Sequence, residues 1–376
     1  MENLTDAPTY SQDADTKPGY IDHSVENWDT CSHPNILITG GAGYIGSVLV
    51  QKFMEAKKMY NMKTVNRKNK EGKWWKETTP NIRTFKKITV YDNLMYKQTP
   101  LTQYCYRGDE FQFVRGDVRD QEKLLPYIKE ADVIIPLAAI VGAPACERDK
   151  QLAMDVNYRH VKFCCENAQP HCKIIYPNTN SGYGVGEKGV ECTEDTDLKP
   201  ISHYGKTKCL SERVVLDRGG IVFRLATVFG VSPRMRLDLL VNDFTYKAHK
   251  DGYIVLFEWD FVRNYIHVQD VALAFLRAIH YYTHPQKMMM GVYNIGMSDA
   301  NLTKLELAKK IKEHYPKFSI QFDDIAKDPD KRDYIVSNAR IEKTGFKPHY
   351  TLDRGIQELQ KAFDILAPSL NQYTNL

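Results

Sequence analysis

The glycine-rich segment at residues 39–46 constrains the fold of this chain more than any other feature. Gly40, Gly43 and Gly46 directly follow the short apolar run at residues 35–39 and open an amphipathic segment that is typical of a helix. Glycines at this spacing permit a tight strand-to-helix turn and let backbone amides approach a pyrophosphate closely. The partial positive charge at the start of the helix favours the same anion. The segment therefore predicts a dinucleotide-binding turn, with a purely structural turn as the alternative.

Six short apolar runs alternate along the first half of the chain with segments that are typical of helices. Continuous apolar runs suit strands that are buried on both faces of a parallel sheet, and their alternation with helices indicates right-handed βαβ crossovers. We therefore expect a doubly wound parallel sheet, which is an α/β fold. The runs lie at residues 35–39, 88–91, 111–114, 133–135, 173–176 and 221–225.

The chain divides by pattern into three parts. Residues 1–34 are a polar extension that carries Asp and Glu instead of a basic patch before an apolar run, which is not typical of a secretory signal. We expect residues 35–230 to form the dinucleotide-binding domain. Beyond them the pattern changes to mixed segments rich in Arg, Tyr and Asp, so residues 231–376 are predicted to form mainly a smaller substrate-binding α/β domain. Within it, the stretch at about residues 265–282 is expected to pack back against the larger domain.

A basic insertion separates the first predicted helix from the second strand. Residues 57–87 contain 11 Lys or Arg and only two glutamates. Crossovers in such sheets normally leave only a few residues after the helix. One interpretation is a solvated hairpin around Gly72 that Trp74 and Trp75 anchor. The other is a docking patch for an acidic partner or a neighbouring subunit.

The overall composition excludes several classes of protein. Lys and Arg number 51 and Asp and Glu 47, so the net charge of +4 predicts neither nucleic acid nor a membrane surface as the main partner. No apolar stretch approaches the roughly 20 residues that span a bilayer. The eight cysteines show no CxxC or Cys/His ligand spacing, which indicates reduced core thiols and no metal site. We therefore expect a cytoplasmic protein.

Acidic residues end the second and third predicted strands. Asp92 stands where a carboxylate accepts hydrogen bonds from the adenosine ribose hydroxyls, and its charge disfavours a 2′-phosphate, so NAD is predicted rather than NADP. It lies farther from the glycines than the usual distance of about 20 residues because the basic insertion intervenes. Asp117, followed by Val118, is expected to bind the adenine amino group. A plain turn residue is the alternative for both aspartates.

These features, together with motifs farther along, resemble the extended short-chain dehydrogenase/reductase family of nucleotide-sugar epimerases and dehydratases. The resemblance runs from about residue 35 to residue 366. Its motifs are Thr39-Gly-Gly-Ala-Gly-Tyr-Ile-Gly46, Leu137-Ala-Ala139, Asn157, Tyr204-Gly-Lys-Thr-Lys208 and Arg263-Asn-Tyr-Ile-His-Val-Gln-Asp270. It implies an NAD cofactor and a homodimer that is joined through helices. The cofactor-binding residues that it implies are Gly40, Gly43, Tyr44, Ile45, Gly46, Asp92, Asn93, Asp117, Val118, Leu137, Ala138, Ala139, Asn157, Tyr204 and Lys208.

Tyr204 and Lys208 form the predicted catalytic pair. Because they are four residues apart, both point to the same side of a helix. A phenol has an ordinary pKa of about 10, and a nearby ammonium together with the positive nicotinamide ring is expected to lower the pKa of Tyr204. Tyr204 then takes the proton of a sugar hydroxyl while hydride leaves the same carbon. Register to the family's hydroxyl-rich segment assigns the third catalytic role to Thr179, with Ser181 as the alternative.

The resemblance also implies which residues bind the substrate. Departures from the family's motifs disfavour one of the family's reactions. Arg263 and Arg332 match arginines that clamp a nucleotide-sugar diphosphate, for which the planar guanidinium is suited. Dehydratases of the family follow the catalytic Thr with an Asp-Glu pair. Asn180 and Ser181 stand there instead, so dehydration is disfavoured. The predicted substrate-binding residues are Thr179, Asn180, Ser181, Asn242, Arg263 and Arg332, with Arg234 and Arg236 as further anion-binding candidates.

The leading hypothesis from the sequence is an NAD-dependent nucleotide-sugar 4-epimerase that works through a 4-keto intermediate. The alternatives are an NAD(P)H-dependent 4-keto-nucleotide-sugar reductase and a nucleotide-sugar 4,6-dehydratase. A protein of another class, a non-catalytic dinucleotide sensor, is disfavoured because Tyr204 and Lys208 are both retained. In each enzymatic case the partner is a nucleotide-diphosphate sugar.

Overall fold

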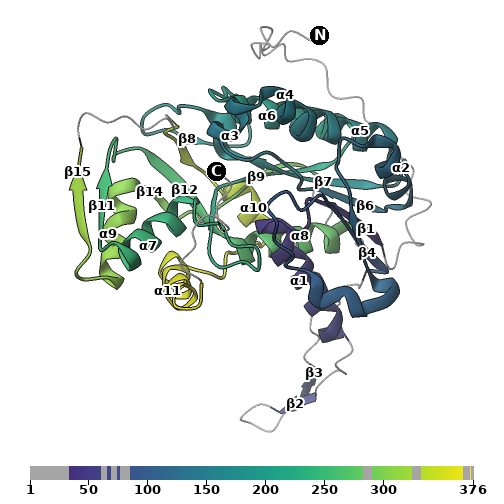
Figure 1. Ribbon diagram of the computed structural model, residues 1–376, viewed down its shortest axis with the longest axis horizontal. Coiled ribbons are helices and arrows are strands. Elements are labelled where there is room, and N and C mark those ends of the chain that lie inside the picture. Colours follow the sequence, from purple (N-terminus) through teal and green to yellow (C-terminus); the bar gives the residue numbers. More distant parts are fainter. Residues whose placement is uncertain are drawn as a thin grey trace.

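A seven-stranded parallel sheet forms the centre of the molecule (Figure 1). The computed structural model describes residues 34–60, 66–68, 74–76, 85–282, 290–323, 332–366 and 373. In spatial order, the strands of the sheet are β13 (Gly291–Ile295), β9 (Ile221–Leu225), β7 (Lys173–Thr179), β6 (Val133–Pro136), β1 (Asn35–Thr39), β4 (Lys87–Asp92) and β5 (Phe111–Arg115). Every neighbouring pair is parallel. The strand order reverses at β1, so the sheet confirms the predicted doubly wound α/β fold.

Helices cover both faces of this sheet (Figure 1). One face carries α1 (Tyr44–Tyr60) and α8 (Val268–Tyr282), and the other carries α2 (Gln121–Glu130), α5 (His160–Asn167) and α6 (His203–Asp217). Alternate side chains of β1 point to opposite faces of the sheet. Ile36 and Ile38 pack in the hydrophobic core on one face, and Leu37 packs in the core on the other. Burial on both faces explains why the predicted strands are rich in apolar residues and do not alternate strictly between apolar and polar ones.

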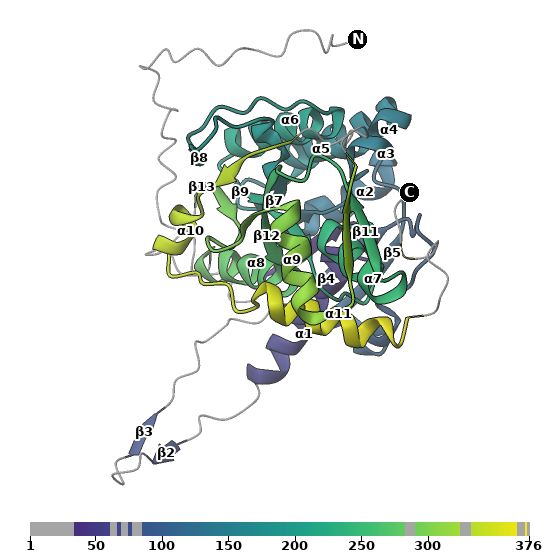
Figure 2. The ribbon, with the colours of Figure 1, turned by 90° about the vertical axis from the view of Figure 1, so that its left-hand side faces the viewer.

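The second half of the chain adds smaller sheets and helices. β10 (Thr227–Phe229), β12 (Val262–His267) and β14 (Asn301–Thr303) form a mixed three-stranded sheet. Two further parallel pairs are β11 (Tyr253–Leu256) with β15 (Ser319–Phe322), and β8 (Glu191–Cys192) with β16 (Ile335–Val336). The helices α7 (Leu240–Lys250), α9 (Lys304–His314) and α11 (Leu352–Phe363) pack on one another (Figure 2), while α10 (Ala339–Lys343) lies near β13.

The chain then returns from the second half to the large sheet. After β12, α8 packs against α1, and β13 adds an edge strand beside β9. The sequence does not predict β13, since three of its five residues are only partly buried and the continuous apolar run of an inner strand is missing. The division of the chain into domains at residue 230 stays a prediction.

Short elements complete the described part of the chain. The 3₁₀ segment η2 (Thr102–Glu110) carries Cys105, whose exposure departs from the expected core thiols because η2 lies at the surface. The helices α3 (Ala143–Arg148) and α4 (Lys150–Met154) lead to the π-helical turn η3 (Asp155–Arg159), and the 3₁₀ turn η4 (Asn180–Tyr183) follows β7. Across the described ranges, no helix is both long and apolar enough to cross a membrane, and no group of His, Cys, Asp or Glu could hold a metal ion.

Only parts of the basic insertion belong to the described residues. β2 (Asn66–Lys68) and β3 (Trp74–Lys76) pair antiparallel, with Arg67 opposite Trp75 and Gly72 in the segment between them. The remainder of residues 61–84, like residues 1–33, lies outside the described residues. Both interpretations of the insertion therefore stay predictions.

Candidate active site

One cavity of about 940 Å³ collects most of the predicted site residues. It lies where the carboxyl ends of the central strands meet segments of the second half of the chain. Parallel sheets place ligands at this edge, next to the point where the strand order reverses. The predicted residues that line the cavity are Gly40, Gly43, Tyr44, Ile45, Gly46, Asp92, Asn93, Asp117, Val118, Leu137, Ala138, Ala139, Thr179, Ser181, Tyr204, Lys208, Arg263 and Arg332, together with Arg234 and Arg236.

The glycine turn forms one wall of the cavity and has no room for side chains. Gly40 has a φ of +68°, and a Cβ atom there would lie 2.5 Å from the Cα atom of Ala138. A Cβ atom on Gly46 would lie 2.6 Å from the Cα atom of Gly41. Without side chains the backbone of the turn can approach a ligand, and α1 can pack closely against it. This cradle, with the start of α1 beside it, fits the diphosphate of a dinucleotide.

Asp92, at the end of β4, is tied to the glycine turn. Its Oδ2 accepts a hydrogen bond from the amide of Ala42 at 3.0 Å, and its Oδ1 accepts one from the amide of Leu94 at 2.8 Å. Burial raises the pKa of Asp92, and these two hydrogen bonds oppose the rise. A carboxylate has about four lone-pair sites, so Asp92 can hold the turn and still accept hydrogen bonds from ribose hydroxyls.

Asp117, just beyond β5, is already paired with an arginine. The Nε and Nη2 atoms of Arg119 donate to its two oxygens, both at 2.9 Å, and Nδ2 of Asn93 donates to the same carboxylate at 3.3 Å. The hydrogen bond from Arg119 lowers the pKa of Asp117 to about 2. Arg119 lines the cavity too and is not among the predicted residues, although its place two residues after Asp117 is a signal of such a pair.

Tyr204 and Lys208 line the cavity from the first turns of α6. Ser202 caps this helix, since its hydroxyl accepts a hydrogen bond from the amide of Gly205 at 3.1 Å. Lys208 is buried, and its Nζ lies 4.0 Å from the centre of the Tyr176 ring. The structure therefore brings both members of the predicted pair to the cavity.

Burial dominates the protonation of this pair. Withdrawal from water raises the pKa of Tyr204 to about 12 and lowers the pKa of Lys208 to about 7. At Tyr204 the largest opposing influence is the charge of Arg332, followed by that of Arg236. Among the chain's own residues desolvation thus outweighs the nearby charges, and the predicted lowering of the pKa of Tyr204 beside a nicotinamide ring stays a prediction. Forming the phenolate requires further positive charge next to the phenol.

The residues around the end of β7 connect the two halves of the chain. Thr179 Oγ1 lies 2.9 Å from Ser181 Oγ and accepts a hydrogen bond from the amide of Ser181 at 3.1 Å. From the second half, Nη1 of Arg332 donates to Ser181 Oγ. Nη1 of Arg263 donates in turn to the carbonyl oxygens of Arg332 and Val262. Two hydroxyls and two guanidinium groups therefore share one end of the cavity.

Asn157 does not line the cavity, although it was predicted to bind the cofactor. It is buried behind the wall, where its Oδ1 accepts a hydrogen bond from the amide of Ile140 at 2.8 Å. Its Nδ2 donates to the Ile140 carbonyl at 3.0 Å and to Thr207 Oγ1 at 3.2 Å. Asn157 thus connects the segment after β6 with α6, and its amide is used in these contacts.

Asn242 and Asn180 do not line the cavity either. Asn242 is fully buried and holds the loop after β10, since its Oδ1 accepts from the amide of Gly230 at 3.0 Å and its Nδ2 donates to the carbonyl of Arg236 at 2.8 Å. Asn180, in η4, exposes only 2% of its surface. The structure therefore places both asparagines away from the predicted substrate contacts.

The sequence did not predict a buried ion pair that lies behind the predicted catalytic pair. Glu212, one turn beyond Lys208 on α6, accepts hydrogen bonds from Nη2 (2.6 Å) and Nε (3.1 Å) of Arg224 in β9. It also accepts one from Asn178, the neighbour of Thr179. The ion pair thereby connects the helix that carries the catalytic pair with the end of β7. An arginine inside an apolar strand was the signal that could have indicated it, because a buried charge needs a partner.

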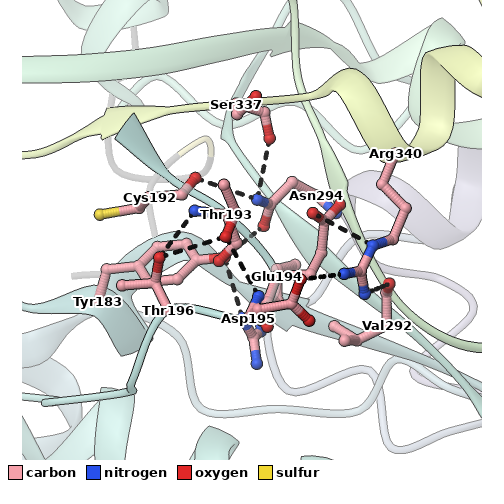
Figure 3. Close-up of polar contacts among 11 residues, drawn as sticks. Tyr183, Cys192, Thr193, Glu194, Asp195, Thr196, Val292, Asn294, Ser337 and Arg340 are labelled. Atoms are coloured by element: carbon pink, nitrogen blue, oxygen red, sulfur yellow. Dashed lines mark hydrogen bonds and ion pairs between the residues drawn. The ribbon is translucent and has the colours of Figure 1, made fainter. Parts of the chain in front are cut away.

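The same polar network continues to the second half of the chain, as Figure 3 shows. The hydroxyl of Tyr183, in the turn after Thr179, donates to Oδ1 of Asn294 at 2.7 Å. The amide of Asn294 donates to Oε1 of Glu194 at 2.8 Å, and Nε of Arg340 lies 3.5 Å from Oε2 of Glu194. Buried polar groups that satisfy one another in this way make their surroundings rigid. The network thus supports the end of β7 from behind.

Comparisons with known proteins cover most of the chain. The model of the NAD dependent epimerase/dehydratase family matches residues 36–296. The low-salt glycan biosynthesis protein Agl12 of Haloferax volcanii is 24% identical over 86% of this chain and 96% of its own length. Two solved structures share the fold. The dTDP-glucose 4,6-dehydratase of Bacillus anthracis, in complex with NAD, has a TM-score of 0.67 at 24% identity, over 88% of this chain and 96% of that chain. The UDP-glucose 4-epimerase of Thermotoga maritima, with UDP-glucose, has a TM-score of 0.69 at 23% identity, over 88% of this chain and 99% of that chain.

Proposed function

Because this chain belongs to the NAD dependent epimerase/dehydratase family, we propose that it is a nucleotide-sugar 4-epimerase that keeps NAD bound throughout the reaction. The observation that carries the proposal is that Tyr204, Lys208 and Thr179 line the same cavity. The two residues that follow Thr179 are Asn180 and Ser181, neither of which carries a carboxylate. Such a site can move a proton on and off a hydroxyl group, but it lacks the acid and base that expel water from a sugar.

The residues of the glycine turn and of α6 fit NAD. The turn from Gly40 to Gly46 would hold the diphosphate, Asp92 the adenosine ribose and Lys208 the nicotinamide ribose. When bound, NAD accepts a hydride from the sugar, returns it, and brings positive charge next to the phenol. The lack of space for a Cβ atom at Gly40 supports this assignment, because the cradle is shaped for close backbone contact.

Tyr204 moves the proton in the proposed reaction. Its oxygen takes the proton of the sugar's 4-hydroxyl while the same carbon loses hydride, and it returns the proton after the 4-keto sugar has turned over in the cavity. Thr179 hydrogen-bonds the reacting oxygen. The charges of Arg332 and Arg236 both favour the phenolate, which supports Tyr204 as the base.

The arginines at the same end of the cavity support a diphosphate-linked sugar as substrate. Arg263 and Arg332 lie beside the hydroxyls of Thr179 and Ser181, so a diphosphate held there would leave its sugar near Tyr204. The guanidinium group suits this ligand because its N–H groups form a planar fork that matches phosphate oxygens.

A 4,6-dehydratase is less well supported than an epimerase. The carboxylates among the described lining residues belong to Asp92, Asp117, Asp238 and Asp243, and none of these lies on β7 or η4. Dehydration requires a general acid and a general base beside the sugar ring. A 4-keto-sugar reductase would use the same residues as the epimerase and would differ in releasing oxidised cofactor.

Two measurements on the purified full chain test the proposal. Mass spectrometry after denaturation identifies the dinucleotide that co-purifies, and NMR follows UDP-, GDP-, dTDP- and CDP-sugars that are incubated without added NAD(P)H. We expect bound NAD and an equilibrium mixture of two 4-epimers. The Tyr204→Phe variant is the matched control, which should bind NAD and leave the sugar unchanged. Stoichiometric consumption of added NAD(P)H would establish the reductase instead, and loss of water from the sugar would establish the dehydratase.

A further inference from the structure

Arg234 is a buried arginine, and two of its guanidinium nitrogens have no hydrogen-bond partner among the described residues. It follows β10 in the loop that leads to α7, lines the cavity and exposes only 2% of its surface. Among the described residues, neither its Nε nor its Nη2 has a partner. Arginine is rarely buried unless it is paired, because an unpaired guanidinium loses its hydration without compensation. An unpaired one at a cavity wall indicates that a ligand supplies the acceptor.

The nearby carboxylates do not serve as this acceptor. The charge of Arg234 lowers the pKa of Asp92, yet neither Nε nor Nη2 of Arg234 donates a hydrogen bond to its carboxylate. Asp238 is held by Arg236 through hydrogen bonds of 3.2 and 2.5 Å. The ring of Tyr96 covers one face of the Arg234 guanidinium, with its centre 4.2 Å from Cζ. Burial and the like charge of Arg236 lower the pKa of Arg234 to about 10, and a bound anion would relieve both effects.

The loop of Arg234 is fastened to the start of α1. The backbone amide of Arg234 lies within hydrogen-bond distance of Ser47 Oγ (3.4 Å) and Ser232 Oγ (3.2 Å). Ser232 Oγ donates in turn to the carbonyl of Tyr44 at 2.7 Å. Tyr44 and Ser47 belong to the first turn of α1, which faces the cavity beside the glycine turn. Arg234 therefore borders the part of the cavity where the glycine turn and the start of α1 present their backbone amides.

We propose that Arg234 binds the diphosphate of the dinucleotide together with the glycine turn. This inference rests on the proposed function and deepens it, because it names the residue that keeps the cofactor bound between turnovers. Release of the dinucleotide would leave the buried guanidinium without an acceptor again, which opposes release. In the proposed function, Arg263 and Arg332 bind the diphosphate of the sugar nucleotide instead, and they lie near Ser181 at the end of β7.

The test compares two substitutions in the purified full chain. Arg234→Met keeps much of the length of the side chain and removes its charge. Arg159→Met is the matched control, since Arg159 lies outside the cavity and 54% of its side chain is exposed. Calorimetric titrations use NAD, ADP, adenosine and UDP as separate probes, the amount of co-purified NAD per chain is measured, and the melting temperature is recorded without added ligand.

We expect the Kd values for NAD and ADP to rise about 10- to 100-fold in Arg234→Met, because a charge-assisted hydrogen bond to phosphate is lost. The Kd values for adenosine and UDP should not change, and the melting temperature without ligand should be equal or higher. Arg159→Met should match the wild type throughout. An unchanged Kd for ADP, or a loss of UDP binding in place of ADP binding, would overturn the proposal.

A lower melting temperature together with weaker binding of all four probes would also overturn it, since Arg234 would then support the fold. None of these measurements requires turnover. A chain that fails to epimerise any sugar but loses ADP affinity in Arg234→Met would therefore contradict the proposed function and leave the anion site in place.

Discussion

A Lys208→Met variant should be more stable than the wild type at and below neutral pH. In the folded protein, burial lowers the pKa of Lys208 from 10.5 to about 7, which corresponds to about 5 kcal/mol at about 1.4 kcal/mol per pKa unit. Methionine is flexible and fills a similar space without carrying a charge. At about pH 6 we therefore expect the free energy of unfolding to rise by up to about 5 kcal/mol in the variant.

This gain should fade as the pH rises. The unfolded chain keeps Lys208 protonated up to its ordinary pKa, whereas the folded chain releases the proton above about pH 7. Between about pH 7 and pH 10 the unfolded state thus binds more protons, so the stability of the wild type rises by about 1.4 kcal/mol per pH unit. The advantage of Lys208→Met should shrink by the same amount over this range and should be small at about pH 10.

Urea unfolding followed by circular dichroism measures the free energy of unfolding at each pH. Lys206→Met is the matched control, since Lys206 is exposed on the same helix, and it should change stability by less than about 0.5 kcal/mol. If wild type and Lys208→Met showed the same dependence on pH, or if the variant were the less stable protein at about pH 6, the conclusion that desolvation dominates at Lys208 would be refuted.

Four further substitutions test other parts of the site. Tyr204→Phe should lower kcat about 100- to 10,000-fold in the NMR assay while NAD stays bound, and unchanged turnover would exclude the assigned proton transfer. Gly40→Ala should purify without NAD, because its Cβ atom would lie 2.5 Å from the Cα atom of Ala138, and full NAD occupancy would argue against this close approach. Glu212→Gln leaves Arg224 without its anion and should cost about 3–5 kcal/mol in urea unfolding. Adding Arg224→Met should restore much of that loss, so a strictly additive double variant would contradict the pairing.

The central sheet could be predicted because burial on both faces leaves a mark in the sequence. β6 is apolar throughout and β1 has an apolar centre of three residues between Asn35 and Thr39, and each strand lies between two neighbouring strands. β13 lies at the edge, and three of its five residues are only partly buried. It pairs with β9 after a long excursion through the second half of the chain. The local sequence of β13 does not predict its pairing with a strand so distant in the chain, because whether a segment forms a strand depends on the strands beside it in the fold.

The site could be predicted where it depends on a turn or on helical spacing, and not where it depends on burial. Gly40 and the pair Tyr204 and Lys208 carry local signals, and all three line the cavity. Asn157 and Asn242 look like ligand-binding asparagines in the sequence, and only the fold shows that their amides hold backbone segments. The raised pKa of Tyr204 depends on how much water the folded chain excludes, which no spacing of residues encodes.

In its proposed role at the adenosine ribose, the carboxylate of Asp92 would make a preference for NAD hard to reverse. Accommodating a 2′-phosphate requires that this acid be removed and that a cation be supplied nearby. Here the same acid accepts the amide hydrogen of Ala42, so its removal would also release the glycine turn from the end of β4. A change toward NADP would have to replace two contacts of Asp92 at the same time: its proposed hydrogen bonds to the ribose and its hydrogen bond from the amide of Ala42. Single substitutions at Asp92 should therefore yield variants that bind both NAD and NADP poorly. A change from NAD to NADP specificity, by evolution or by design, would have to pass through such poorly binding variants.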